Sequence, residues 1–117
     1  MKWLITVLLV IGPSLGIGAR QAWPDSAPDN YTAYCSRCHG EAGHGDGPAA
    51  STLKTSPQDL ADCSRLSKIS DRTMFKTIKN GGLAVGMPDD MPEWSNDLTD
   101  DEIHDLVGYI RTFCKRK

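Results

Sequence analysis

The stretch Cys35-Ser36-Arg37-Cys38-His39 decides the fold of this chain. On a helical turn, residues three and four apart project from the same side, so the two thiols and the imidazole face one way. Gly40 follows directly and lets the backbone turn close beside whatever these groups hold. Two sulfur atoms and one ring nitrogen from five residues therefore predict a single large ligand bound on this side.

The spacing is that of the C-x-x-C-H motif, which is typical of covalent haem attachment. Cys35 and Cys38 are placed to reach the two vinyl groups on one edge of a porphyrin and form thioethers. His39 lies four residues after Cys35, which brings its imidazole over the same ring as a ligand to iron. We therefore predict one haem c, bound through Cys35 and Cys38, with His39 on the iron.

Other uses of a C-x-x-C pair agree less well with the sequence. A zinc site needs two further Cys or His ligands at paired spacing, whereas Cys63 and Cys114 are solitary and His44 lies in a glycine-rich loop. A thioredoxin-like redox pair needs a βαβ setting, which the pattern does not show. An ordinary disulfide would leave the adjacent His39 unexplained.

The second axial ligand of the iron is less directly specified. Iron held by His on one side can take Met, His or nothing on the other. Met87 and Met91 lie in a loop, and each precedes a proline, which favours an extended approach to iron. His44 follows His39 too closely to reach the opposite side, and His104 is expected on the solvent face of a helix. The residue pattern alone leaves both methionines open.

Taken together, four segments make the chain similar to a bacterial mono-haem class I c-type cytochrome. They are CSRCHGEAGHGDG (35–47), Gly81-Gly82, Met91-Pro92-Glu93-Trp94 and LTDDEIHDLVGYIRTF (98–113), and the resemblance spans about residues 29–114. In that family a Met-Pro-x-aromatic element supplies the distal ligand just before the last helix. The resemblance therefore implies Met91 as the metal ligand, since Met87 lacks the aromatic residue.

The same resemblance implies contacts around the cofactor. Tyr31 and Tyr34 are expected to pack across the last helix, and Trp94 to lie near the haem edge. The carbonyl of Pro48 or of a neighbour is expected to hold the second ring nitrogen of His39 and so to orient the imidazole. Simple core packing is the alternative for each of these residues.

Apolar spacing and capping residues predict an all-α fold without strands. The mature chain has few large apolar side chains, so the ligand must complete its core. We expect a small class I cytochrome c fold, with three to five helices wrapped around one covalently attached haem. The expected helices are a short one capped by Asp29 or Asn30, one within 57–66, one capped by Ser70 and ended by 80–82, and a last one opened by the capping box Thr99–Glu102.

The N-terminus is typical of an export signal. Lys2 precedes the apolar run Trp3–Ile11, and small residues follow. We predict a signal peptide over 1–18 with cleavage within 18–22, a flexible leader over 19–28 and a cytochrome c domain over 29–117, located in the periplasm. An uncleaved membrane anchor is the alternative, although Pro13 and several glycines make that stretch a poor permanent helix.

The net charge of the chain indicates which classes of partner it can bind. The 117-residue chain has 13 basic and 15 acidic side chains, and loss of residues 1–18 removes Lys2 and brings the net charge from −2 to −3. This balance argues against nucleic acid. The stretch 89–105 has eight acids and no Lys or Arg, which suits docking onto a basic surface, although a solvated face is the simpler explanation.

Cys63 and Cys114 have no part in haem attachment. In an oxidising compartment two remaining cysteines most simply pair, so we predict a disulfide between them. Two separate thiols, or pairing between molecules, are the alternatives.

These features predict a single-electron carrier rather than an enzyme. A His/Met-ligated haem c has no open iron position for a substrate, and its partners would be an oxidase, a reductase or a dehydrogenase in an extracytoplasmic respiratory chain. We expect a monomer, tethered to a membrane only if the N-terminal segment stays attached. A haem enzyme or a gas-sensing module, with a weak or displaceable distal ligand, is the alternative.

Overall fold

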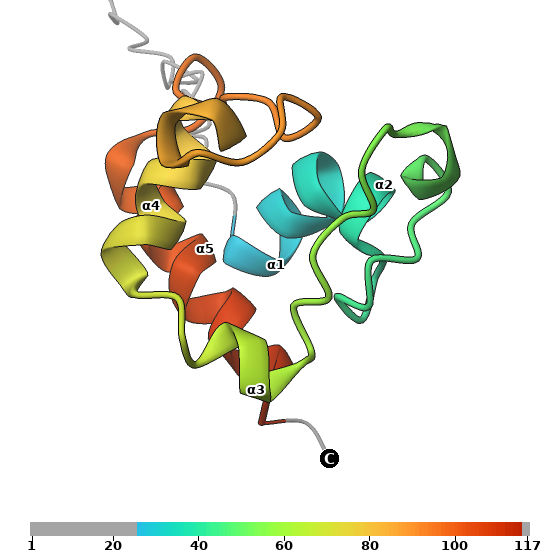
Figure 1. Cartoon of the computed structure of the whole chain (residues 1–117). Coiled ribbons are helices and arrows are strands. Elements are labelled where there is room, and N and C mark those ends of the chain that lie inside the picture. The colour runs from blue at the N-terminus through green and yellow to red at the C-terminus, as the bar shows by residue number, and fades with distance from the viewer. Residues whose placement is uncertain (1–25, 116–117) are drawn as a thin grey trace, which may run out of the picture.

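The computed structural model describes residues 26–115, and in this range the chain forms helices and loops without a strand. The elements are α1 (Ala27–Asn30), the π-helical turn η1 (Tyr31–Cys35), α2 (Ser36–His39), the 3-10 turn η2 (Ala50–Thr52), α3 (Cys63–Leu66), α4 (Asp71–Asn80), the 3-10 turn η3 (Gly82–Val85) and α5 (Asp100–Phe113) (Figure 1). This arrangement confirms the all-α prediction.

The N-terminal predictions fall mostly elsewhere in the chain. The predicted signal peptide over 1–18, its cleavage region 18–22 and most of the leader over 19–28 lie outside the described residues. No helix within 26–115 has the length and apolar character needed to span a bilayer.

The first helical segment begins earlier than predicted. Ser26, rather than Asp29 or Asn30, is the N-cap, and its hydroxyl oxygen accepts a hydrogen bond from the Asp29 amide at 3.4 Å. Pro28, which suits a first helical turn, lies directly after Ala27. The helical path continues through η1 into α2 and ends at Gly40, whose φ of 81° is accessible mainly to glycine. The C-x-x-C-H motif therefore lies at the end of this helical segment.

Helices α3 and α4 differ in how closely they follow the sequence-based prediction. The helix expected within 57–66 is limited to α3, because the Asp62 carboxylate accepts the amides of Ser64 and Arg65 and starts the helix there. By contrast, the Ser70 hydroxyl caps α4 as predicted, accepting the Thr73 amide at 3.1 Å. Residues 57–61 remain a loop, of which Leu60 and Ala61 pack against the buried core.

The predicted capping box opens α5. The amide of Glu102 donates to the hydroxyl oxygen of Thr99 at 3.3 Å, and the Thr99 amide donates to the Glu102 carboxylate at 2.8 Å. These bonds from Thr99 hold the pKa of Glu102 below its usual range. The apolar face that follows is buried: Ile103, Leu106, Val107, Ile110 and Phe113.

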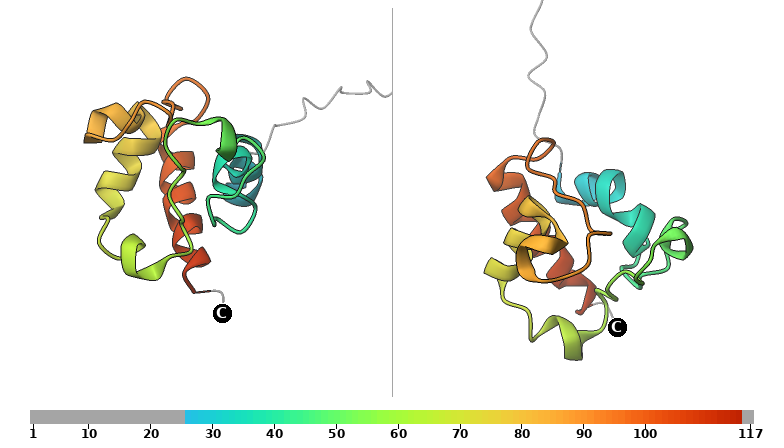
Figure 2. Two further views of the ribbon diagram at one scale, coloured as in Figure 1. Left: turned by 45° about the vertical axis from the view of Figure 1, so that its right-hand side comes forward. Right: turned by 45° about the horizontal axis from the view of Figure 1, so that its top comes forward.

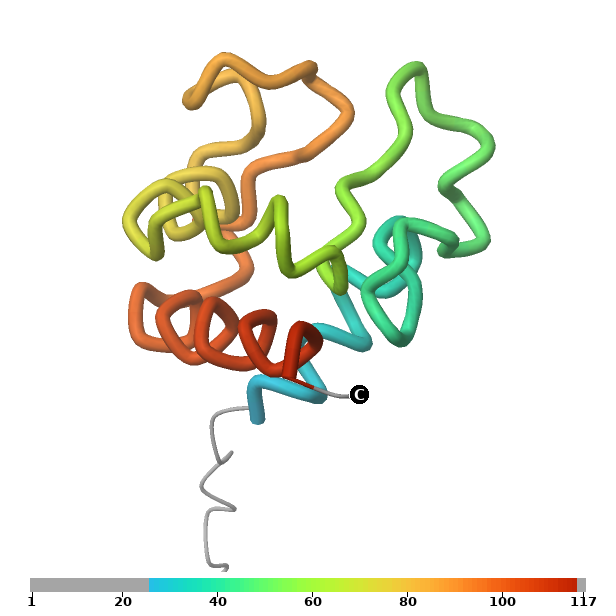
Figure 3. Tube along the Cα trace, turned by 60° about the horizontal axis from the view of Figure 1, so that its bottom comes forward, coloured from blue at the N-terminus to red at the C-terminus, as the bar shows by residue number. Residues whose placement is uncertain are grey.

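Helix α5 is the central helix of the core and contacts both α1 and α4. Tyr31 is almost fully buried, with its ring edge-on to Tyr109 and Phe113 at centroid distances of 5.5 and 4.9 Å. This confirms the packing expected of Tyr31. The loops in green (residues around 45–60) and orange (residues around 83–97) lie together on one side of α5 (Figures 2 and 3). That side holds the candidate site.

Arg111 fixes the turn between α3 and α4 against the end of α5. Its guanidinium donates to the carbonyls of Leu66, at 2.6 Å, and of Ile69, and to the Asp71 carboxylate at 2.8 and 2.9 Å. Leu66 and Ile69 both line the cavity described below. The Arg111 guanidinium thus fixes the segment between α3 and α4 that lines the cavity.

Candidate haem site

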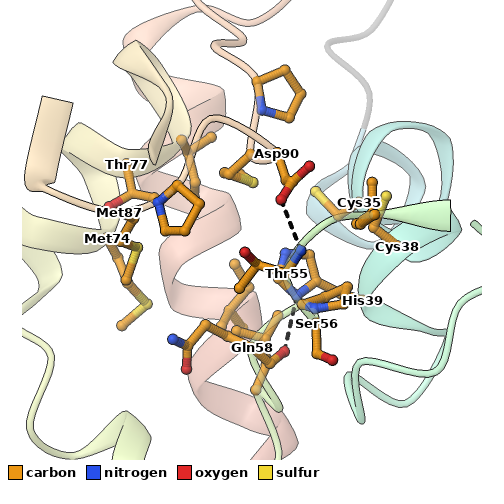
Figure 4. Close-up of a pocket in the computed structure, with 18 of the residues that line it drawn as sticks. Cys35, Cys38, His39, Thr55, Ser56, Gln58, Met74, Thr77, Met87 and Asp90 are labelled. Carbon is orange, nitrogen blue, oxygen red and sulfur yellow. Dashed lines mark hydrogen bonds between the residues drawn. The ribbon is translucent and has the colours of Figure 1, made fainter. Parts of the chain in front are cut away.

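A cavity that is partly open to solvent lies between the helices and the two long loops (Figure 4). Its walls come from the C-x-x-C-H turn, the segment 53–60, the α3–α4 region and the segment 87–94. Most of the lining is apolar, including Leu53, Leu60, Leu66, Ile69, Ile78 and Ile110. A large apolar ligand is the kind of molecule that such a space can take.

One wall holds the three groups predicted from the motif. Cys35, Cys38 and His39 all line the cavity (Figure 4), and neither cysteine is paired in the structure. Nδ1 of His39 lies 3.0 Å from the carbonyl oxygen of Gln58. This contact orients the imidazole and leaves Nε2 as the nitrogen that can bind a metal.

The partner of His39 corrects one expectation. The carbonyl that orients the imidazole belongs to Gln58 and not to Pro48. The loop around Pro48 packs along the backbone of α2 instead, because Gly47 donates to the Cys38 carbonyl at 3.1 Å and Ala49 to the Arg37 carbonyl at 2.9 Å. A backbone carbonyl carries no side-chain signal, so the sequence could not identify Gln58.

Burial shapes the protonation of these groups. Desolvation lowers the pKa of His39, and the hydrogen bond to the Gln58 carbonyl opposes this effect. Desolvation, with a smaller contribution from Cys38, raises the pKa of Cys35 to about 12. The site therefore favours a neutral imidazole, which is the metal-binding form, beside a protonated thiol.

The other wall holds methionines. Met74, Met87 and Met91 line the cavity, and Figure 4 shows Met74 and Met87 across the space from Cys35 and His39. The structure thus brings both loop methionines to the site. The resemblance implies that Met91 alone is the iron ligand, so the presence of Met87 in the same cavity leaves two candidate sulfur atoms.

Gly82 brings the two loop methionines close to the end of α4. Its amide donates to the Met91 carbonyl and its carbonyl accepts the Met87 amide, both at 2.9 Å. A Cβ at this position would lie 2.4 Å from the Pro88 carbonyl oxygen and 3.3 Å from the Cβ atoms of Met87 and Met91. Only glycine allows this close approach.

The remaining histidines lie away from the cavity. His44 is exposed, with its Nδ1 3.5 Å from the Asp59 carboxylate. His104 is exposed, as predicted, and stacks on Phe75 at a centroid distance of 4.3 Å. Neither residue lines the site.

Two aromatic rings close one edge of the cavity. Tyr34 and Trp94 both line it, with their ring centroids 5.1 Å apart. Tyr34 thus packs on Trp94 as well as lining the cavity, and Trp94 is available to a ligand bound there.

These residues fit a covalently bound haem. Two unpaired thiols and an oriented imidazole lie on one side, Met74 and Met87 lie across the cavity from them, and most of the other lining side chains are apolar (Figure 4). Cys35 and Cys38 would hold the porphyrin, with His39 and a loop methionine as ligands to its iron. The bound group supplies one-electron redox chemistry, and the chain controls its position and surroundings.

Comparison with known proteins agrees with this geometry. The family model described as "Cytochrome C oxidase, cbb3-type, subunit III" matches residues 22–110. A solved structure, the KustC0563 c-type cytochrome, is similar with a TM-score of 0.63 and 26% identity, over 76% of this chain and 98% of that one. No curated protein sequence matches. The chain therefore belongs to the family of cbb3-type cytochrome c oxidase subunit III, as a mono-haem class I c-type cytochrome that carries haem c.

Proposed function

We propose that the protein is a single-electron carrier in which His39 and Met91 bind the haem iron from opposite sides, with Cys35 and Cys38 as the thioether residues. The observation that supports this most strongly is that two thiols and an oriented imidazole line one side of an apolar cavity that Met91 also lines. An electron carrier needs this closed arrangement, because two protein ligands leave no iron position for a substrate.

Met91 is preferred to Met87 on both sequence and local structure. The Met91 carbonyl accepts the Gly82 amide at 2.9 Å, and the Trp94 amide donates to the Ile78 carbonyl at 3.0 Å. The segment that carries Met91 is therefore anchored to the end of α4 on both sides of Pro92. A ligand on a backbone fixed at two points keeps its place when the iron changes oxidation state.

The surroundings suit electron transfer at a relatively high potential. A thioether ligand and an apolar environment favour the reduced iron. Retaining the same two ligands in both oxidation states keeps the reorganisation small. We propose that the protein is exported to the periplasm and exchanges electrons there with other redox proteins of a respiratory chain.

Part of the acidic stretch remains available for docking. Asp90, Asp100 and Glu102 are engaged with Thr55, Lys79 and Thr99. Asp97, Asp101 and Asp105 are exposed. We propose that these three carboxylates steer the protein towards a basic surface on its partner.

Binding of small exogenous ligands tests the closed iron site. We expect carbon monoxide to bind the native reduced protein, and imidazole the native oxidised protein, only slowly and weakly, because each must first displace the methionine. Optical titration measures both. Rapid, tight binding would contradict the electron-carrier proposal and would instead favour a haem enzyme or a gas-sensing module.

We also propose that Cys63 and Cys114 form a disulfide in the exported protein. Their Cα atoms lie 5.1 Å apart, a separation that a disulfide can span, and the bridge would tie the start of α3 to the end of α5. Closing a loop between residues 51 positions apart stabilises a small domain by roughly 2–4 kcal/mol.

Mass spectrometry and thermal unfolding test this pairing. The intact protein should gain two hydrogens on reduction. Cys63→Ser should lower the free energy of unfolding as much as the double variant Cys63→Ser/Cys114→Ser does, because either change opens the same bridge. Two free thiols in the untreated exported protein would rule the disulfide out without affecting the haem site.

A further inference from the structure

Asp90 joins two loops at the rim of the cavity. Its Oδ2 accepts the Thr55 amide at 3.0 Å and its Oδ1 accepts the Lys54 amide at 3.4 Å, across 35 and 36 residues of sequence. Asp90 and Thr55 both line the cavity, and Figure 4 shows a hydrogen bond running between them. One carboxylate thus connects two segments that no regular secondary structure holds together.

These two segments carry groups for opposite sides of the iron. Gln58, three residues after Thr55, holds Nδ1 of His39. Met91 directly follows Asp90. Hydrogen bonds to a carboxylate are stronger than those between neutral groups, so the bonds to Asp90 restrict how far the methionine loop can move from the loop that supports His39.

We propose that Asp90 is a positioning residue that keeps Met91 on the iron by fastening its loop to the loop 54–58. This inference rests on the proposed ligation by His39 and Met91. An exogenous ligand binds only when Met91 has left, so its apparent affinity increases in proportion to the fraction of molecules with an open loop. Loss of the Asp90 hydrogen bonds increases that fraction.

Imidazole titration of the oxidised full-length holoprotein tests the proposal. Asp90→Ala should bind imidazole roughly 5–20-fold more tightly than the native protein does. Asp90→Asn should show a smaller gain, since its amide oxygen can still accept the Thr55 amide. Asp89→Asn is the matched control, because it removes the same charge one residue away from an exposed side chain. Its imidazole affinity should remain within about twofold of the native value.

The possible outcomes separate this inference from the proposed function. The oxidised native protein should show the weak long-wavelength absorption band of methionine bound to ferric haem. If that band is missing, the ligation is wrong. If it is present and Asp90→Ala binds imidazole like the native protein, only the role of Asp90 is wrong. Equal gains in Asp90→Ala and Asp89→Asn would also contradict it, because charge alone would then explain them.

Hydrogen exchange provides a test that needs no variant. The Thr55 amide of the native holoprotein should exchange at least tenfold more slowly than an unbonded exposed amide does. Exchange at the unprotected rate would overturn the proposal even if Asp90→Ala fails to accumulate as folded protein.

Discussion

Replacing both Cys35 and Cys38 with alanine should abolish covalently retained haem. Each thiol lines the cavity, and without them no thioether to the porphyrin can form. Protein made in a host equipped for cytochrome maturation should lose its pigment to acidic acetone, whereas the native pigment should stay with the polypeptide. Haem staining of denaturing gels measures the same difference.

The loss should extend to the fold. The described residues surround a large cavity with mostly apolar walls, and a chain this small has little other core to compensate. Far-ultraviolet circular dichroism should therefore show reduced helix content in the double variant. Cys63→Ser/Cys114→Ser is the control, since it removes two cysteines remote from the motif and should retain the pigment. Pigment that resists extraction from Cys35→Ala/Cys38→Ala would refute the assigned attachment.

Met91→Ala should produce the second large effect. Losing the thioether ligand should lower the reduction potential by on the order of 0.1 V or more, because methionine favours the ferrous state. The long-wavelength band of the oxidised protein should disappear, and imidazole should bind at least about tenfold more tightly, since no side chain has to leave first. Redox titration and optical spectra measure all three changes.

Met87→Ala is the control for Met91→Ala, because both methionines line the cavity. Met87 lines the same space and also precedes a proline, so the two variants differ chiefly in which sulfur remains. We expect Met87→Ala to keep the band and to retain a potential close to the native value. The opposite pattern, with the band lost in Met87→Ala and kept in Met91→Ala, would identify Met87 as the ligand to the iron.

Local features of the chain were predictable because their causes lie within a few residues of each other. The C-x-x-C-H spacing places three groups on one turn, and all three line the cavity. The Thr99–Glu102 capping box and the Ser70 cap each involve partners three residues apart. The first helix was the exception, because the Ser26 cap lies just before the residues that had looked most suitable.

Contacts between distant segments were not predictable from the sequence. The carbonyl of Gln58 reaches His39 across 19 residues, and the carboxylate of Asp90 reaches Thr55 across 35. No side-chain pattern identifies either partner, since Gln58 contributes only its backbone carbonyl and Thr55 only its backbone amide.

The sequence by itself therefore determined the cofactor class, the residues of the attachment motif and the all-α architecture, because these follow from short-range spacing and helix capping. The tertiary structure decided which carbonyl orients His39, that Met87 and Met91 both line the cavity beside Gly82, and that Asp90 joins the two loops. Those features depend on where loops meet after α5 has packed against α1 and α4. Packing of remote segments sets such distances, and no local pattern encodes them.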